Sequence, residues 1–116
     1  MNPKTGAPKT VRIGPFTFVV RWFDKTMWDV KEKDGWCDHD HQVIALYEGF
    51  SVERVAETFL HEVTHAVIGQ AFLWGEDSTP SEENVVHVLG IALTAFWIQN
   101  PAAFRWWSKL IGGKKC

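Results

Sequence analysis

The stretch SVERVAETFLHEVTHAV, residues 51–67, decides the fold of this chain. Ser51 is a typical helix-capping residue, and the apolar residues after it recur at spacings of three and four, which predicts an amphipathic helix with one buried stripe. The residues of this stripe are Val55, Phe59, Val63, Ala66 and Val67. The same helix contains the pentapeptide HEVTH at residues 61–65.

HEVTH places two imidazoles one helical turn apart with a carboxylate between them. On a helix, His61 and His65 project from one face about 5–6 Å apart, so both rings can bind a single Zn²⁺ ion. Glu62 is then placed to take a proton from a metal-bound water, the role that the HExxH pattern assigns to its glutamate. The alternative interpretation is a pair of ordinary surface or core histidines on an amphipathic helix.

A catalytic zinc ion needs a third protein ligand, and a second predicted helix offers one. The residues TPSEENVVHVLGIALTAFWIQN begin with Thr79 as N-cap and Pro80 at the first helical position, and Glu82 closes a capping box. Glu83 has no capping role and lies on the face expected to contact the first helix. The other residues of that face are Val86, Gly90, Leu93 and Trp97. We therefore predict Glu83 as the third ligand, the alternative being a solvated glutamate favoured by the helix dipole.

HEVTH followed by ENVVHVLGIAL resembles the gluzincin branch of zinc metallopeptidases, the thermolysin-like group, over about residues 51–100. The resemblance implies that His61, His65 and Glu83 bind Zn²⁺ and that Glu62 is the general base for peptide-bond hydrolysis. In that group an acidic residue one turn after the ligand glutamate holds a zinc histidine, whereas this chain has His87 there. His87 is accordingly a candidate partner for a ligand imidazole, a fourth ligand that would close the site, or a partly buried helix histidine.

The chain before residue 51 predicts a small sheet. Residues 11–13 and 16–23 are rich in β-branched and aromatic side chains and are joined by a bend at Gly14-Pro15. Residues 35–49 predict one or two further strands after a turn at Asp34-Gly35. In the thermolysin-like group an edge strand beside the active-site helix binds the extended substrate by main-chain hydrogen bonds, and the segment from Gln42 to Tyr47 is the candidate by position.

The segment CDHDH, residues 37–41, concentrates five potential metal ligands. In a strand, Cys37, His39 and His41 would share one face. A second metal site, a contribution to the catalytic cleft and a solvated polar strand all remain open for this segment. The candidates for stabilising the transition state are His87, Tyr47, His39 and His41.

Length and charge limit the other possibilities. The 116 residues fit one domain, and a net charge of −2 gives no field suited to a nucleic-acid backbone. The apolar stretch 85–98 is shorter than the ~20 residues that cross a bilayer, so we expect neither a nucleic-acid nor a membrane partner. Residues 1–10 are expected to form a flexible arm and not a secretion signal, and residues 112–116 a flexible tail.

We therefore predict an α+β fold with a small N-terminal sheet of three to four strands packed on the active-site helix, followed by two further helices. Residues 11–111 would form a single minimal zincin-like metallopeptidase domain, whose last helix runs from about residue 101 to 111 and is capped by Asn100. The expected activity is zinc-dependent hydrolysis of a peptide or protein substrate.

The setting and the rival functions are also inferred from the sequence. The chain resembles the short metallopeptidases of bacteriophages and bacteria, and we expect it in the cytoplasm, which is the host cytoplasm if a phage encodes it. One alternative is a zinc-stabilised binding or regulatory module without turnover. Another is a metal-free interaction protein that uses its tryptophan-rich last helix.

Overall fold

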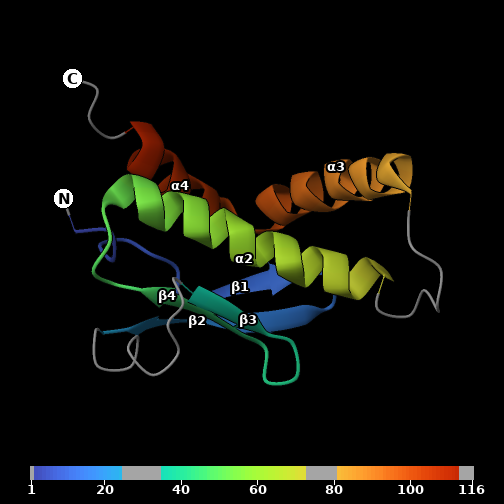
Figure 1. Cartoon of the computed structure of the whole chain (residues 1–116). Helices are drawn as coiled ribbons and strands as arrows, with labels where there is room; N and C mark the ends of the chain where they lie inside the picture. Colours follow the sequence, from blue (N-terminus) through green and yellow to red (C-terminus); the bar gives the residue numbers. More distant parts are fainter. Residues whose placement is uncertain (1, 25–34, 73–80, 113–116) are drawn as a thin grey trace.

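The computed structural model describes residues 2–24, 35–72 and 81–112. Within these residues a four-stranded sheet precedes three helices (Figure 1), which confirms the predicted α+β fold. The elements are β1 (Thr10–Ile13), β2 (Phe16–Phe23), β3 (Gly35–Asp38), β4 (Val43–Tyr47), α2 (Val52–Phe72), α3 (Glu82–Gln99) and α4 (Pro101–Gly112).

The sheet is mixed and has the strand order β1-β2-β4-β3. β1 and β2 are antiparallel, β2 and β4 are parallel, and β4 and β3 are antiparallel. The prediction that Gln42 to Tyr47 supplies a substrate-binding edge is therefore wrong, because β4 has a hydrogen-bonded strand on each side. Within the described residues, the edge beside α2 on this side of the sheet is β3.

The core lies between one face of the sheet and α2 (Figure 1). The inner face of the sheet contributes Phe18, Ile44 and Leu46, each no more than 2 % exposed. The predicted apolar stripe of α2, from Val55 to Val67, is buried along its whole length. Each large apolar side chain buried in this way stabilises the fold by about 1.5–3 kcal/mol. The resulting contact fixes the rotation of α2, and with it the direction of its remaining side chains.

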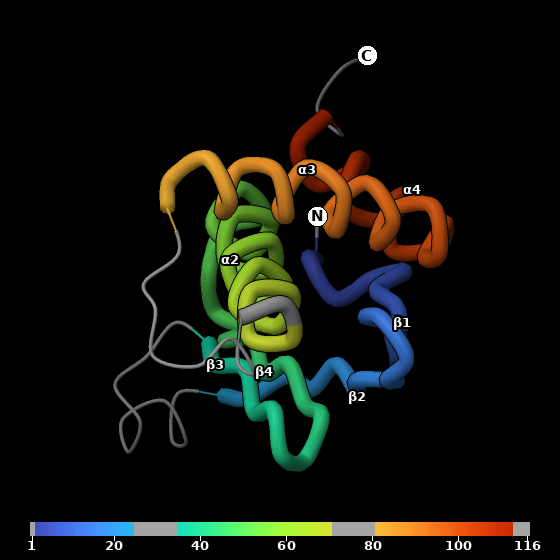
Figure 2. Tube along the Cα trace, turned by 90° about the vertical axis from the view of Figure 1, so that its right-hand side faces the viewer, coloured from blue at the N-terminus to red at the C-terminus, as the bar shows by residue number. Residues whose placement is uncertain are grey.

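The last two helices form a third layer. α3 crosses α2 on the side away from the sheet, and α4 contacts both α2 and α3 (Figure 2). The rings of Trp106 and Phe59 pack edge to face, with their centroids 5.1 Å apart. The indole N–H of Trp107 donates to the carbonyl of Ala56 at 2.9 Å. No single helix of the described chain is long and apolar enough to cross a membrane; α3 and α4 meet that test only as a pair, and they are bent by 102°.

Asn100, at the junction of α3 and α4, does not use its side chain as the predicted helix cap. Its Oδ1 accepts from the backbone N–H of Arg12 at 2.7 Å, and its Nδ2 donates to the carbonyl of Arg12 at 2.8 Å. The amide thus pairs with β1 as a neighbouring strand would. The first turn of α4 is closed by the backbone instead, since the N–H of Phe104 donates to the carbonyl of Asn100 at 3.0 Å.

The segment expected to be a flexible arm makes specific contacts where it is described. Pro3 is buried, and its carbonyl accepts a 2.7 Å hydrogen bond from the indole of Trp106. The ammonium of Lys4 lies 2.9 Å from a carboxylate oxygen of Glu48. Of the segment expected to be a tail, residues 112–116, only Gly112 is described, as the last residue of α4.

Candidate functional site

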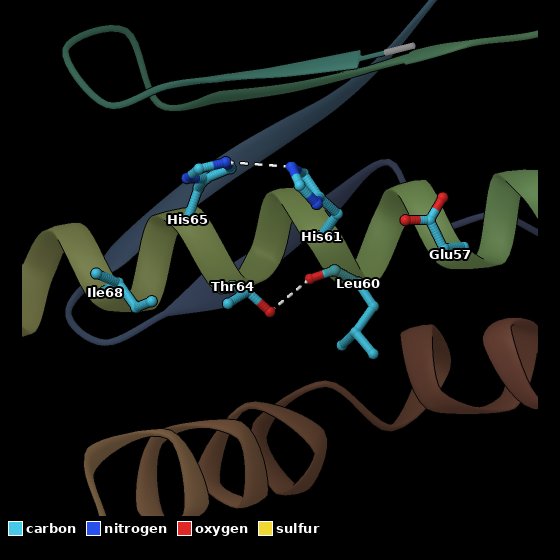
Figure 3. Close-up of a pocket in the computed structure, with 6 residues that line it drawn as sticks. All are labelled: Glu57, Leu60, His61, Thr64, His65 and Ile68. Carbon is cyan, nitrogen blue, oxygen red and sulfur yellow. Dashed lines mark hydrogen bonds between the residues drawn. The ribbon is translucent and has the colours of Figure 1, made fainter. Parts of the chain in front are cut away.

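His61 and His65 lie one above the other on the exposed side of α2. Their Nε2 atoms are 3.2 Å apart, and their ring centroids 4.8 Å (Figure 3). Two nitrogens bound to one tetrahedral zinc ion at 2.0–2.1 Å would be about 3.3–3.4 Å apart. The imidazole pair therefore fits two adjacent corners of a zinc site. Without a metal, one ring would donate and the other accept a hydrogen bond at this distance.

Glu62 differs from its two neighbours because it is buried, with 5 % of its surface exposed. On the facing strand, Cys37 lies on the inner side of β3 in register with Ile44. Burial first, and then the charges of Glu62 and Asp38, raise the pKa of the Cys37 thiol to about 12. The Glu62 carboxylate on α2 is therefore close enough to Cys37 on β3 for its charge to raise the pKa of the thiol.

A groove of about 330 Å³ runs along α2 beside the histidines. Figure 3 shows His61 and His65 on one side of the helix and Leu60 pointing to the other. Glu57 also lines this groove, one turn before His61. The sequence interpretation missed Glu57, although its position four residues before His61 was a usable signal, since residues at that spacing share a helix face.

Glu83, the predicted third ligand, is exposed and is not brought to the histidines. The face predicted to contact α2 is also wrong in its first half. Val86 is 59 % exposed, and a Cβ at Gly90 would meet nothing within 4 Å. α3 packs on the core through a stripe that keeps Leu93 and Trp97 of the predicted face and adds Leu89, Ala92 and Phe96. The physical reason is that α3 is apolar around most of its circumference, so periodicity does not select one face.

The start of α3 also differs from the prediction. The helix begins at Glu82, and Ser81 is its N-cap, with its hydroxyl accepting from the N–H of Asn84 at 3.1 Å. The capping box predicted for Thr79 and Glu82 is therefore wrong, and Thr79 itself lies outside the described residues. Glu82 and Glu83 both lie in the first turn, where the helix dipole favours acidic side chains.

The residues of the structure fit a pair of zinc ligands but not a full set. Within residues 2–24, 35–72 and 81–112, no group of three His, Cys, Asp or Glu side chains lies close enough together to hold a metal ion. The predicted ligands are thus divided: His61 and His65 converge, while Glu83 lies apart on α3. Glu62, predicted as a base and not as a ligand, is buried next to the pair.

The four candidates for transition-state stabilisation lie in different parts of the structure. His87 is exposed on α3, and Tyr47 contacts Phe23 and Phe50, on the sheet face opposite the inner residues. The strand expected to align His39 with His41 ends at Asp38, so the two histidines separate in the turn before β4.

His41 and His39 have different contacts in this turn. The backbone N–H of His41 donates to Asp38 at 3.0 Å, and its ring bonds the same carboxylate, which lowers the pKa of Asp38. The ring of His39 lies on Gly69 of α2, where an added Cβ would collide with its Cε1. His39 therefore contacts α2 one turn after His65, on the helix face that holds His61 and His65.

Comparisons with protein-family models, with curated proteins and with solved structures give no match to this chain. The functional conclusion therefore depends on the geometry of α2 and its surroundings alone.

Proposed function

We propose that this protein is a zinc-dependent peptidase. The observation that supports the proposal is the arrangement on α2, where two imidazole nitrogens converge at 3.2 Å and a buried carboxylate lies between them in sequence. An exposed histidine pair with no function does not need a buried, ionisable neighbour, because burying a carboxylate is unfavourable unless the fold compensates it.

In this proposal His61 and His65 would hold the zinc ion, and Glu83, which lies apart from the pair in this structure, would be its third protein ligand. Bound zinc would supply a water with a pKa near 7 and polarise the scissile carbonyl. Glu62 takes the proton from the attacking water and passes it to the leaving amine. Its burial keeps the carboxylate away from bulk solvent.

The proposed substrate is a peptide in extended conformation. Among the described strands, β3 is the sheet edge next to α2, so its outer backbone groups can bind such a peptide by strand addition. The 330 Å³ groove along Leu60, Thr64 and Ile68 would then receive substrate side chains on the far side of the histidines. We propose the cytoplasm as the place of action, with neither nucleic acid nor membrane as a partner.

One observation favours a second candidate function. Because Glu83 is exposed and separate from the histidine pair, the chain could bind zinc for stability, without turnover, as a binding or regulatory module. The two functions differ in what Glu62 does. In a peptidase its carboxylate is needed for cleavage, whereas in a module it has no step to perform.

The test compares the wild type with Glu62→Gln, which keeps the shape of the side chain and removes its basicity. Both proteins are loaded with zinc, assayed for metal content and incubated with a peptide library. We expect equal zinc content and a loss of cleavage of roughly 100-fold or more in the variant. Glu53→Gln, on the first turn of α2, is the matched control and should cleave as the wild type does.

Equal cleavage by the wild type and Glu62→Gln would refute the peptidase assignment. Stable zinc binding without cleavage of any library peptide would favour the binding module. A chain that binds no zinc would contradict both functions and leave the metal-free interaction protein.

A further inference from the structure

A second cavity, of about 210 Å³, lies where the turn between β3 and β4 meets the C-terminal half of α2. Gly69 forms part of its wall, and the ring of His39 lies on that glycine. Gly69 follows His65 by one helical turn on the same face of α2, a rise of about 6 Å. Because an extended peptide advances about 3.3–3.6 Å per residue, a substrate bound at the histidines would bring a side chain to this cavity within two residues.

The apolar part of the cavity is aromatic. Phe16 and Phe18 both line it, and Phe16 is 47 % exposed whereas Phe18 is 2 % exposed. Phenylalanine rings accept the methylene stem of a long side chain, and their faces attract a cation. The cavity wall therefore suits a chain of methylenes that ends in a positive charge.

The side-chain amide of Gln42 offers an acceptor to a ligand in the cavity. The side-chain Nε2 of Gln42 donates to the carbonyl of Thr17 at 3.2 Å, and that of Gln70 donates to the carbonyl of Ile13 at 2.9 Å. Since a carbonyl can only accept, both amides are oriented with their nitrogens on the sheet. The Oε1 of Gln42 is then left to accept from a ligand.

Asp40 adds a negative charge to the same lining. Within the described part of the chain, its carboxylate has neither an ion pair nor a side-chain hydrogen bond. Among the residues that the structure describes, no lysine or arginine lines the cavity to oppose a bound cation. His39 is the other titratable group of the lining, and its neutral ring also offers an acceptor nitrogen.

The backbone holds this wall in place. Gln42 has a φ of 57°, in the left-handed region that a glutamine rarely adopts. Its carbonyl accepts from the N–H of Val19 at 2.8 Å while its side chain bonds Thr17, so the main chain and the amide are both attached to β2. A fixed acceptor needs little reordering when a ligand binds.

We propose that this cavity is a specificity pocket for a lysine or arginine side chain of the substrate, within two residues of the cleaved bond. The inference depends on the proposed peptidase function for its substrate. The Phe16 and Phe18 rings would contact the aliphatic stem, and the Asp40 carboxylate and the Gln42 oxygen would bind the charged end.

The first test reads the cleavage positions chosen from a library in which every amino acid occurs at every position. The zinc-loaded wild type should cut with lysine or arginine enriched roughly tenfold or more at one position within two residues of the bond, the range expected for hydrogen bonds to a charged group. Asp40→Asn should reduce this enrichment, and Asp40→Lys should replace it by a preference for glutamate. Asp38→Asn is the matched control, since Asp38 does not line the cavity and an asparagine still accepts from His41.

A second test separates the pocket from the chemistry. Binding of a lysine peptide and of its norleucine analogue to Glu62→Gln is measured by calorimetry, with and without Asp40→Asn. We expect about tenfold tighter binding of the lysine peptide, and loss of that difference in the double variant.

The outcomes of the two tests distinguish the pocket from the peptidase. Glu62-dependent cleavage without enrichment of basic residues would overturn the pocket and leave the peptidase standing. Asp40-dependent binding of the lysine peptide to a chain that never cleaves would support the pocket and overturn the peptidase. Equal binding of the two peptides would overturn the pocket whatever the activity.

Discussion

Replacing Asn100 by alanine tests how the third layer of the molecule is attached to the sheet. The side chain makes three hydrogen bonds, two with the backbone of Arg12 and one from its Nδ2 to the carbonyl of Phe96 at 2.8 Å. Asn100 is 8 % exposed, so water has little access to the groups that it pairs. The truncation removes all three bonds and leaves the outer N–H and carbonyl of Arg12 without these partners.

The magnitude follows from these contacts. A protein hydrogen bond contributes about 0.5–1.5 kcal/mol net, so three bonds at a nearly buried site correspond to about 2–4 kcal/mol of unfolding free energy. Arg12 lies on an exposed edge of β1, and partial hydration of its backbone would move the value toward the lower end. Asn100→Asp should also destabilise the fold, because a carboxylate keeps the acceptor for the N–H of Arg12 but loses both donors.

Urea unfolding measures this effect when the zinc concentration is the same for every variant, since a ligand that binds the folded state shifts the midpoint. We expect a midpoint lower by on the order of 1–2 M at an unchanged slope. Gln99→Ala, next in the chain and exposed, is the control and should stay within about 0.5 kcal/mol of the wild type. A midpoint for Asn100→Ala equal to that of the control would refute the role assigned to this side chain.

Three further predictions concern the site and its support. Glu83→Ala should weaken zinc binding, measured by competition with a chelator, by at least tenfold more than Glu82→Ala, and the reverse ranking would exclude Glu83 as the ligand. Thr58→Val should raise the unfolding free energy by about 1 kcal/mol, because the buried Oγ1 of Thr58 has no hydrogen-bond partner among the described residues; a loss of stability would mean that the hydroxyl is bonded. The raised pKa of Cys37 means that its thiol ionises in the unfolded chain from about pH 9, but in the folded chain only near pH 12. Stability relative to Cys37→Ala should therefore fall as the pH rises through that window and be constant below it; a pH-independent difference would contradict the assignment.

The sequence predicted correctly those features whose residue pattern depends on a single helix or strand. The stripe from Val55 to Val67 recurs with the helical period, and all five of its residues are buried in α2. β2 has the predicted bounds, Phe16–Phe23, because its β-branched and aromatic residues stand between clear turn signals. His61 and His65 converge for the same reason, since a spacing of four on one helix fixes their relation without help from the rest of the fold.

Prediction failed where the outcome depends on which element a side chain meets. The position of Asn100 predicts a helix cap, yet its side-chain amide forms hydrogen bonds with β1, a strand far away in the sequence. The segment from Gln42 to Tyr47 is predicted as the edge strand by its position alone, but pairing on both sides makes it internal. The predicted cap at Thr79 failed for another reason, because Ser81 offers a competing hydroxyl closer to the start of α3.

The amino-acid sequence by itself determined the α+β class, the helix α2 and the imidazole pair, because these follow from local periodicity and from spacing within one helix. Only the tertiary structure decided that β3 is the edge beside α2, that Glu62 is buried near it, and that His39 reaches Gly69. Those relations join segments that are distant in the chain, and the packing of the whole core fixes them together. α3 shows the limit most clearly, since a helix that is apolar nearly all round turns toward its neighbours whichever face fits the space between them.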